Sequence, residues 1–109
     1  MVASVQNGTQ AATIGTEHAL GGDIAAPGTY ILVVNTANMV NGDVVELRAK
    51  TKVLPGGAAG AYLLATYAHV QGDPVKMSIP VPSPYSLACT LKQTAGAAGR
   101  SFEWNILGL

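Results

Sequence analysis

The hydrophobic and polar residues of this chain alternate with a period of two along much of its length. From Val45 to Val53, the odd positions carry Val, Leu, Ala and Thr, while the even positions carry one Glu and three basic residues. Tyr85–Gln93 and Ser101–Ile106 alternate in the same way. Because successive side chains of a strand point to opposite faces, each segment is predicted as a strand with one face in a core and the other in solvent.

Two further segments are predicted as strands from their composition. Tyr30–Val34 is an unbroken run of aromatic and aliphatic residues, which suits a strand covered on both faces. In the stretch 61–71, alanine favours a helix, but the tyrosines and β-branched residues favour a strand. We interpret it as a strand that carries Tyr62 and Tyr67 on opposite faces.

The second half of the chain is punctuated by proline and glycine. Val75–Ile79 is predicted as a short strand, and the prolines at 80, 82 and 84 predict an extended segment outside any β-ladder. Gly96–Gly99 supplies a turn between the last two alternating segments. We therefore expect these segments to form a hairpin, with Trp104 as the aromatic anchor of the core.

These elements predict an all-β fold. Counting the N-terminal arm and a strand at Glu17–Leu20, we expect about eight short strands and no helix, which is typical of a small β-sandwich or jelly roll. Residues 1–16 are small and polar and predict an extended N-terminal arm, whereas 17–109 form a single β-sandwich domain. The expected core anchors are Tyr30, Leu47, Tyr85, Leu87, Leu91, Phe102, Trp104 and Ile106.

Composition limits the functional classes. Of the 109 residues, 49% are hydrophobic and only 11% are charged, and six basic residues balance six acidic ones. The chain therefore lacks the positive charge of a nucleic-acid-binding protein, and it contains neither a membrane-spanning apolar run nor a signal peptide, so we expect a cytoplasmic location. So few charges indicate a subunit that buries much of its surface in an assembly.

The arm is the first candidate for an assembly contact. A strand-forming arm can complete the sheet of a neighbouring subunit, although a frayed terminus is the alternative. The residues expected to make such contacts are Thr9, Gln10, Ala12, Thr13 and Ile14.

No catalytic constellation is recognisable. The Gly56–Gly60 loop lacks the Lys-Ser/Thr of a phosphate-binding loop, and His18, His69 and Cys89 lack the close spacings of a zinc site. Cys89 lies on the predicted apolar face of its strand and is expected to be an inert buried thiol. We therefore expect no enzyme activity and no cofactor.

Two clusters of charged residues have ordinary structural explanations. Three aspartates directly follow glycine and fit turns better than a calcium site: Asp23, Asp43 and Asp73. Three basic residues share one strand face, where Glu46 interrupts them, and fit a solvated face better than a nucleic-acid surface: Arg48, Lys50 and Lys52.

Four segments together resemble small virion proteins encoded among the structural genes of tailed bacteriophages: Gly28–Asn35, Asn41–Arg48, Leu91–Gly96 and Phe102–Leu107. The likeness extends over most of 12–109. It implies a capsid decoration or cement protein located in the virion after assembly in the host cytoplasm. Its implied partners are the major capsid protein and copies of itself, in a trimer or another cluster.

The leading hypothesis is a structural virion protein that stabilises a capsid by bridging shell subunits. A phage tail or head–tail joining subunit is the first alternative. A carbohydrate-binding module is the second, because aromatic side chains offer stacking faces for sugars: Tyr62, Tyr67, Tyr85 and Trp104.

Overall fold

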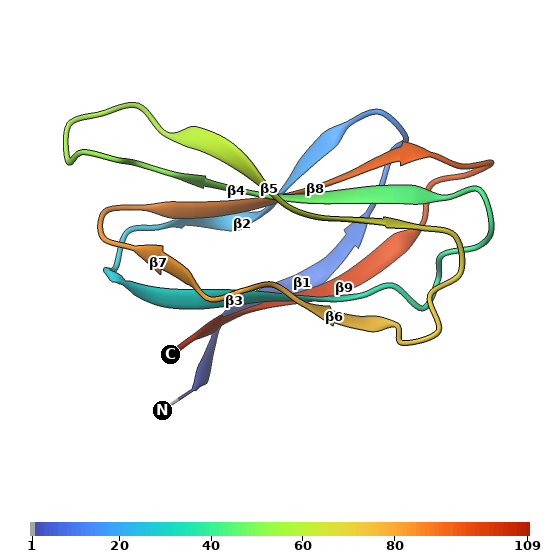
Figure 1. Cartoon of the computed structure of the whole chain (residues 1–109), viewed down its shortest axis with the longest axis horizontal. Helices are drawn as coiled ribbons and strands as arrows, with labels where there is room; N and C mark the ends of the chain where they lie inside the picture. Colours follow the sequence, from blue (N-terminus) through green and yellow to red (C-terminus); the bar gives the residue numbers. More distant parts are fainter. Residues whose placement is uncertain (1) are drawn as a thin grey trace.

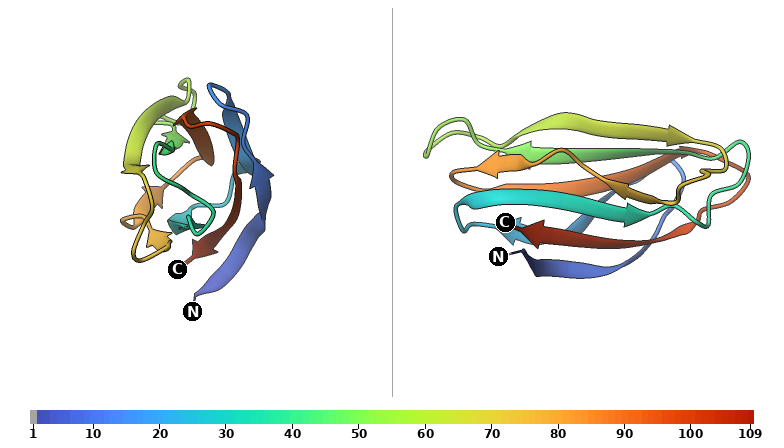
Figure 2. Two further views of the ribbon diagram at one scale, coloured as in Figure 1. Left: turned by 90° about the vertical axis from the view of Figure 1, so that its right-hand side faces the viewer. Right: turned by 60° about the horizontal axis from the view of Figure 1, so that its bottom comes forward.

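Residues 2–109, described by a computed structural model, form two antiparallel β-sheets packed face to face (Figure 1). The nine strands are β1 (Ala3–Ala11), β2 (Glu17–Ile24), β3 (Gly28–Asn35), β4 (Val44–Thr51), β5 (Gly60–Ala68), β6 (Val75–Met77), β7 (Val81–Ser83), β8 (Leu87–Ala95) and β9 (Ser101–Gly108). Figure 2 shows the two layers from the end and from below. The predicted all-β sandwich is confirmed, and these residues contain no helix that could cross a membrane.

The strand order is that of a jelly roll. One sheet, here called sheet A, has the order β1-β9-β3-β6, with β7 also paired to β3, and sheet B has the order β2-β8-β4-β5. The chain changes sheet at every connection except β4–β5 and β6–β7. If β6 and β7 are counted as one interrupted strand, four strands of each sheet interleave as in an eight-stranded jelly roll.

The interruption lies at Ser78, between β6 and β7. Its backbone N–H donates to the carbonyl oxygen of Leu32 (2.8 Å), and its Oγ accepts the Leu32 N–H (2.9 Å). The chain then returns to the ladder, where Pro82 pairs with Thr29. The prediction that the proline segment lies outside any ladder is wrong, because an edge strand tolerates a proline whose missing N–H would face away from its neighbour.

The predicted hairpin between the last two segments is also wrong. β8 pairs with β2 and β4 in sheet B, whereas β9 pairs with β1 and β3 in sheet A. Both strands do bury alternate residues, as predicted. Alternation is the same for two strands of one hairpin and for two strands that face each other across a core, so the pattern could not distinguish the arrangements.

The core lies between the sheets. Seven of the eight predicted anchors are buried there: Tyr30, Leu47, Leu87, Leu91, Phe102, Trp104 and Ile106. The exception is Tyr85, which is 37% exposed and precedes β8, in the connection from β7. The alternating sequence pattern begins at Tyr85, but the ladder between β4 and β8 reaches only the pair Thr51–Leu87. Tyr85 therefore lies outside the paired part of the strand, and its side chain is not packed in the core.

Most of the segment predicted as an arm is a strand of the same molecule. β1 pairs along its length with β9, and Gly8 lies opposite Trp104. A Cβ on Gly8 would stand 3.4 Å from the indole, which is ordinary van der Waals contact, so the strand lies directly against this side chain. Of the predicted contact residues, Thr9 and Gln10 lie in β1, and those at 12–14 lie in the following loop.

A β-bulge in β5 changes the predicted placement of its tyrosines. The register shifts between Leu47 and Arg48, so Tyr62 pairs with Ala49 and Tyr67 pairs with Val45. Both partners are fully buried, which places both tyrosines on the inward face of sheet B. The prediction that they occupy opposite faces is therefore wrong.

Candidate interaction surface

The outer face of sheet B carries a mosaic of paired charges. Five of the chain's twelve charged residues lie on it: Glu17, Glu46, Arg48, Lys50 and Lys92. Arg48 lies 3.1 Å from Glu46, and Lys50 lies 3.9 Å from Glu17. Thr90 donates a hydrogen bond to Glu17 (2.5 Å), and this bond, with the nearby basic residues, lowers the pKa of that carboxyl. The predicted basic stripe is thus balanced by acidic neighbours.

The outer face of sheet A is different, because among the described residues Glu103 is its only charged one. Polar side chains bond to one another across its strands. Ser4 Oγ donates to Asn105 Oδ1 (2.8 Å), and Asn35 Nδ2 donates to Glu103 Oε1 (3.1 Å). Asn35, Glu103 and Asn105 line a shallow groove of about 470 Å³, one wall of which includes Val33.

The apolar run of β3 is covered on one face only. Tyr30, Leu32 and Val34 are buried in the core, whereas Ile31 and Val33 point outward and are half-buried. No strand of residues 2–109 packs over this outer face. The prediction of a strand covered on both faces is therefore wrong for the isolated chain, and the outward residues leave an apolar surface without a partner.

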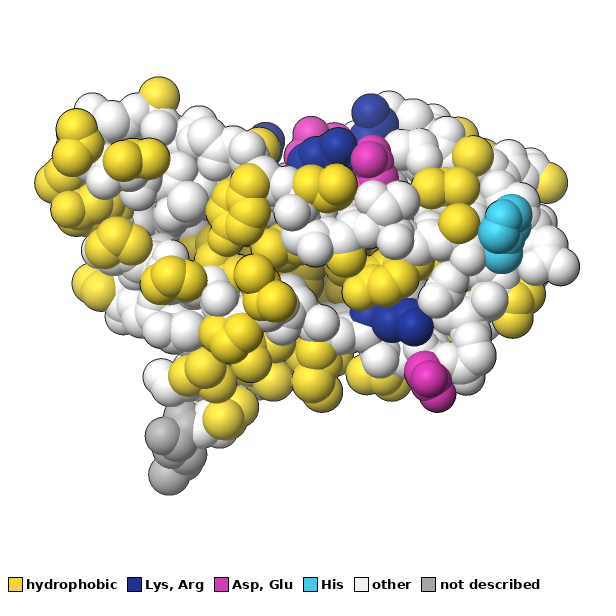
Figure 3. Space-filling view, viewed as in Figure 1, with side chains coloured by type: hydrophobic (Ala, Val, Ile, Leu, Met, Phe, Trp, Pro, Cys, Tyr) yellow, Lys and Arg dark blue, Asp and Glu magenta, His cyan; other side chains and the backbone are white. Residues whose placement is uncertain are grey.

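Exposed aliphatic side chains continue this surface onto β6, and others lie in the β4–β5 loop of the other sheet. Val75 (54% exposed) and Met77 (64%) lie on β6 and Ile79 (71%) just after it, while Val53 (87%) and Leu54 (66%) lie in the β4–β5 loop. These five residues are here called the apolar rim. Figure 3 shows hydrophobic side chains gathered around β6 and at the end that bears this loop, with a basic and an acidic side chain beside those of β6.

The free edges of the sheets differ in how they are protected. The β6–β7 edge is interrupted by prolines, which discourage strand pairing. By contrast, β1 and β5 each have nine residues, contain neither proline nor a charged residue, and pair with only one neighbour. Such edges have backbone groups available for pairing with another strand.

A buried ion pair lies at the opposite end from the β4–β5 loop. Asp43 is fully buried, and its Oδ2 accepts hydrogen bonds from Val40 N–H (2.9 Å) and Arg100 Nε (2.9 Å). Burial opposes ionisation, but these two partners outweigh it and hold the pKa of the carboxyl below 3.8. The Arg100 N–H also donates to Oε1 of the buried Gln93 (2.9 Å). The bonds of Arg100 to Asp43 and Gln93 therefore fix the connection between β8 and β9.

The other candidates for chemistry are not brought together. Within residues 2–109, no three His, Cys, Asp or Glu side chains gather where they could hold a metal ion. Asp23 and Asp73 are exposed, in contrast to Asp43. Cys89 is buried, and burial raises the pKa of its thiol to about 11, so it has the character of a packing residue.

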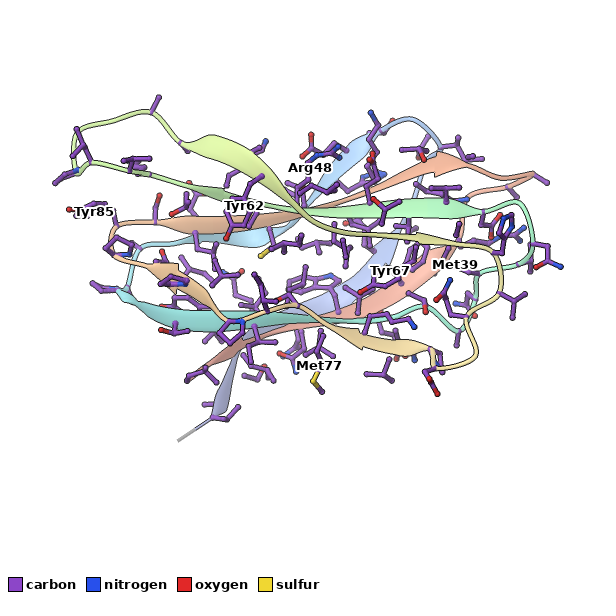
Figure 4. All side chains as sticks on the ribbon, in the orientation of Figure 1. Met39, Arg48, Tyr62, Tyr67, Met77 and Tyr85 are labelled. Atoms are coloured by element: carbon purple, nitrogen blue, oxygen red, sulfur yellow. The ribbon has the colours of Figure 1, made fainter. Side chains whose placement is uncertain are left out.

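The four aromatic residues considered for sugar stacking do not form one platform. Tyr62 and Tyr67 lie on β5, whereas Tyr85 lies in a loop at the end of the molecule (Figure 4). Trp104 is buried in sheet A.

The sequence analysis did not predict the apolar rim. Whether a single aliphatic residue beside a proline or in a loop is exposed depends on the residues that pack around it, and the sequence pattern does not show these.

Comparisons with known proteins relate this chain to others through its fold. No protein-family model and no curated protein sequence matches it. Its structure is similar to chains from the structures of infectious bursal disease virus Gt strain (13% identity, TM-score 0.52) and Gx strain (14% identity, TM-score 0.53). Both matches cover 98% of this chain but only 32% and 31% of the other chains, so this chain spans about a third of their length. This likeness shows a shared fold.

Proposed function

We propose that this protein is a non-enzymatic structural subunit of a virus particle, which binds the shell and bridges neighbouring shell subunits. The observation that carries the proposal is the unequal charge of the two faces: sheet B is covered by paired charges, while sheet A and the apolar rim leave aliphatic side chains uncovered. The similarity to chains from a virus structure supports the same role.

The surface of low charge on sheet A and the apolar rim suits a protein partner. A typical specific interface buries about 800 Å² on each side, which is roughly one-seventh of this chain's 5599 Å². Aliphatic side chains such as Met77 and Ile79 contribute favourable free energy when a partner covers them. Because the protein binds the assembled shell and not its separated subunits, binding stabilises the shell by mass action.

We further propose that the virus is a tailed bacteriophage and that the partner is its major capsid protein. The protein would then be located in virions assembled in the host cytoplasm. Copies of the chain would cluster around the shell contact, as a trimer, through the uncharged edges of β1 and β5.

The test uses shells of the virus that encodes the protein, prepared without it. Added protein should co-sediment with the shells and raise the temperature at which they break. Met77→Lys places a charge on the apolar rim and should abolish both effects, whereas Ala19→Lys, an exposed position opposite Thr90 in sheet B, should retain them. Shells that break at the same temperature with and without the protein, or equal binding of the two variants, would contradict the proposal.

The groove on sheet A favours a second candidate, a carbohydrate-binding module. Amide and carboxylate groups of Asn7, Asn35, Glu103 and Asn105 line it, and such groups form hydrogen bonds with sugar hydroxyls. Binding to a glycan array that is lost in Asn105→Ala but kept in Met77→Lys would favour this function. Rings or tubes that form without any shell would instead favour the tail or head–tail joining alternative.

A further inference from the structure

An exposed turn joins β3 to β4 at the end of the molecule that holds the buried ion pair. The Asp43 N–H donates to the Val40 carbonyl oxygen (3.1 Å), which closes a four-residue turn with Asn41 and Gly42 at its centre. Gly42 has a φ of +98°, as a type II turn requires at its third position. Both central residues are exposed to solvent.

His69 is held against this turn in an unusual backbone conformation. Its φ of +66° is the only positive value among the non-glycine residues of 2–109. Its N–H donates to the Asp43 carbonyl oxygen (2.8 Å), and its Nδ1 accepts the Gly42 N–H (2.9 Å). Because Nδ1 accepts a hydrogen bond, it carries no proton. Unusual backbone conformations of this kind persist where the surrounding structure enforces them, and they cluster at functional sites.

The neighbouring residue contacts the side chain of Asn41. The Val70 N–H points to Asn41 Oδ1 at 3.4 Å, so it can stabilise negative charge that develops on this oxygen. The turn therefore brings together a backbone N–H that donates to the imidazole nitrogen of His69 and a side-chain amide whose oxygen faces the Val70 N–H. In an Asn-Gly pair these groups are adjacent, and glycine offers no side chain to hinder ring closure.

We propose that Asn41–Gly42 is a self-modification site, at which His69 is the general base for conversion of the asparagine through a cyclic imide. The Gly42 nitrogen bonds to Cγ of Asn41 while its proton passes to His69 Nδ1. The Cγ–Nδ2 bond then breaks, the imidazolium returns the proton to the leaving nitrogen, and ammonia departs. Water opens the five-membered imide to aspartate or isoaspartate. No oxidant or external reagent besides water is consumed.

The chain contains a matched site without this arrangement. Asn7–Gly8 has the same dipeptide, but it lies within β1, where Asn7 pairs with Asn105 and Gly8 with Trp104. Asn7 Nδ2 donates to Ser4 Oγ (3.1 Å), and no imidazole in the described part of the chain is bonded to the Gly8 N–H. We therefore expect the folded protein to modify Asn41 selectively.

Modification would change this end of the molecule. It introduces a carboxylate two residues from the buried Asp43, and the isoaspartate product adds a carbon to the main chain of the turn. Both products alter the connection between a strand of sheet A and a strand of sheet B. The inference concerns the chain's own chemistry and is independent of the proposed virion role.

The test follows both sites in one sample by peptide mapping with tandem mass spectrometry. The folded protein is incubated at neutral pH, and the fractions of imide, aspartate and isoaspartate are measured at Asn41 and Asn7 over time. The same measurement is made in urea and on two variants, His69→Asn and His69→Gly, which tolerate positive φ but lack the base. Trp104 fluorescence confirms that each variant is folded.

General bases typically accelerate reactions by about 10² to 10⁴-fold, so Asn41 should react at least about tenfold faster than Asn7 in the folded protein. The two sites should react at similar rates in urea. Either folded variant should slow the reaction at Asn41 about tenfold and leave Asn7 unchanged. Equal rates at the two sites in the folded protein, or an unchanged or faster reaction at Asn41 in the variants, would overturn the proposal.

Discussion

Replacement of the buried carboxylate in Asp43→Asn tests whether the Asp43–Arg100 ion pair stabilises the closed end of the sandwich. The carboxylate is fully buried and accepts hydrogen bonds from Val40 N–H and Arg100 Nε, both at 2.9 Å. Both bonds end on Oδ2, so the asparagine carbonyl oxygen can take its place and accept them, but the neutral amide cannot balance the guanidinium charge. The variant therefore weakens both bonds, because neither acceptor is charged any longer, and leaves the charge of Arg100 uncompensated.

A hydrogen bond to a charged group contributes about 1.5–3 kcal/mol. The side chain of Arg100 is 24% exposed, so water solvates part of its charge in the variant and limits the loss. We expect the free energy of unfolding to fall by about 2 kcal/mol, from a total of roughly 5–15 kcal/mol for a domain of this size. The assay is urea unfolding at pH 7, followed by the fluorescence of Trp104, which is buried in the fold.

The effect should also depend on pH. The pKa of Asp43 is lower in the folded protein than its ordinary value of 3.8, so the charge stabilises the fold above about pH 4 and this contribution is lost as the pH falls through the folded-state pKa. The gap between the wild-type protein and Asp43→Asn should narrow in the same range. The control Asp73→Asn alters an exposed aspartate and should be neutral throughout. A loss below about 0.5 kcal/mol at pH 7, or a gap that stays constant in acid, would refute the reasoning.

Three further predictions concern the core, one turn and the thiol. Leu91→Ala removes a fully buried side chain and should lower the free energy of unfolding by about 3 kcal/mol, whereas Leu54→Ala, at a residue 66% exposed, should change it by less than about 0.5 kcal/mol in the same urea titration. Gly96→Ala should lower the thermal midpoint by several degrees in calorimetry, because φ is +142° there and a Cβ would collide with the Asp43 carboxylate; an unchanged midpoint would argue against this packing. Cys89 is 3% exposed and burial raises its pKa to about 11, so at pH 8 it should react with iodoacetamide only after denaturation, and rapid labelling of the folded protein would be inconsistent with the buried site.

Much of the secondary structure could be predicted from local alternation. The face of β4 that carries Val45, Leu47 and Ala49 is buried as the period of two requires, and the same rule holds for the inward residues of β8 and β9. The alternation of apolar and polar residues shows which side chains of a strand face a core. It does not show which strands pair beside it or which strands lie across that core. The placement of β8 and β9 in different sheets, and of Tyr85 outside the core, therefore came only with the tertiary structure.

The candidate sites divide along the same line. The low charge, the position of Glu46 among basic residues on one strand face and the two Asn-Gly pairs can be recognised from the sequence alone, because these features depend on residues close together in the chain. By contrast, the near absence of charge on one sheet face and the contact of His69 with Gly42, 27 positions away in the sequence, follow from the packing of the strands. Such contacts depend on how strands from distant segments pair and on where the jelly-roll connections turn. A local sequence pattern carries no information about either.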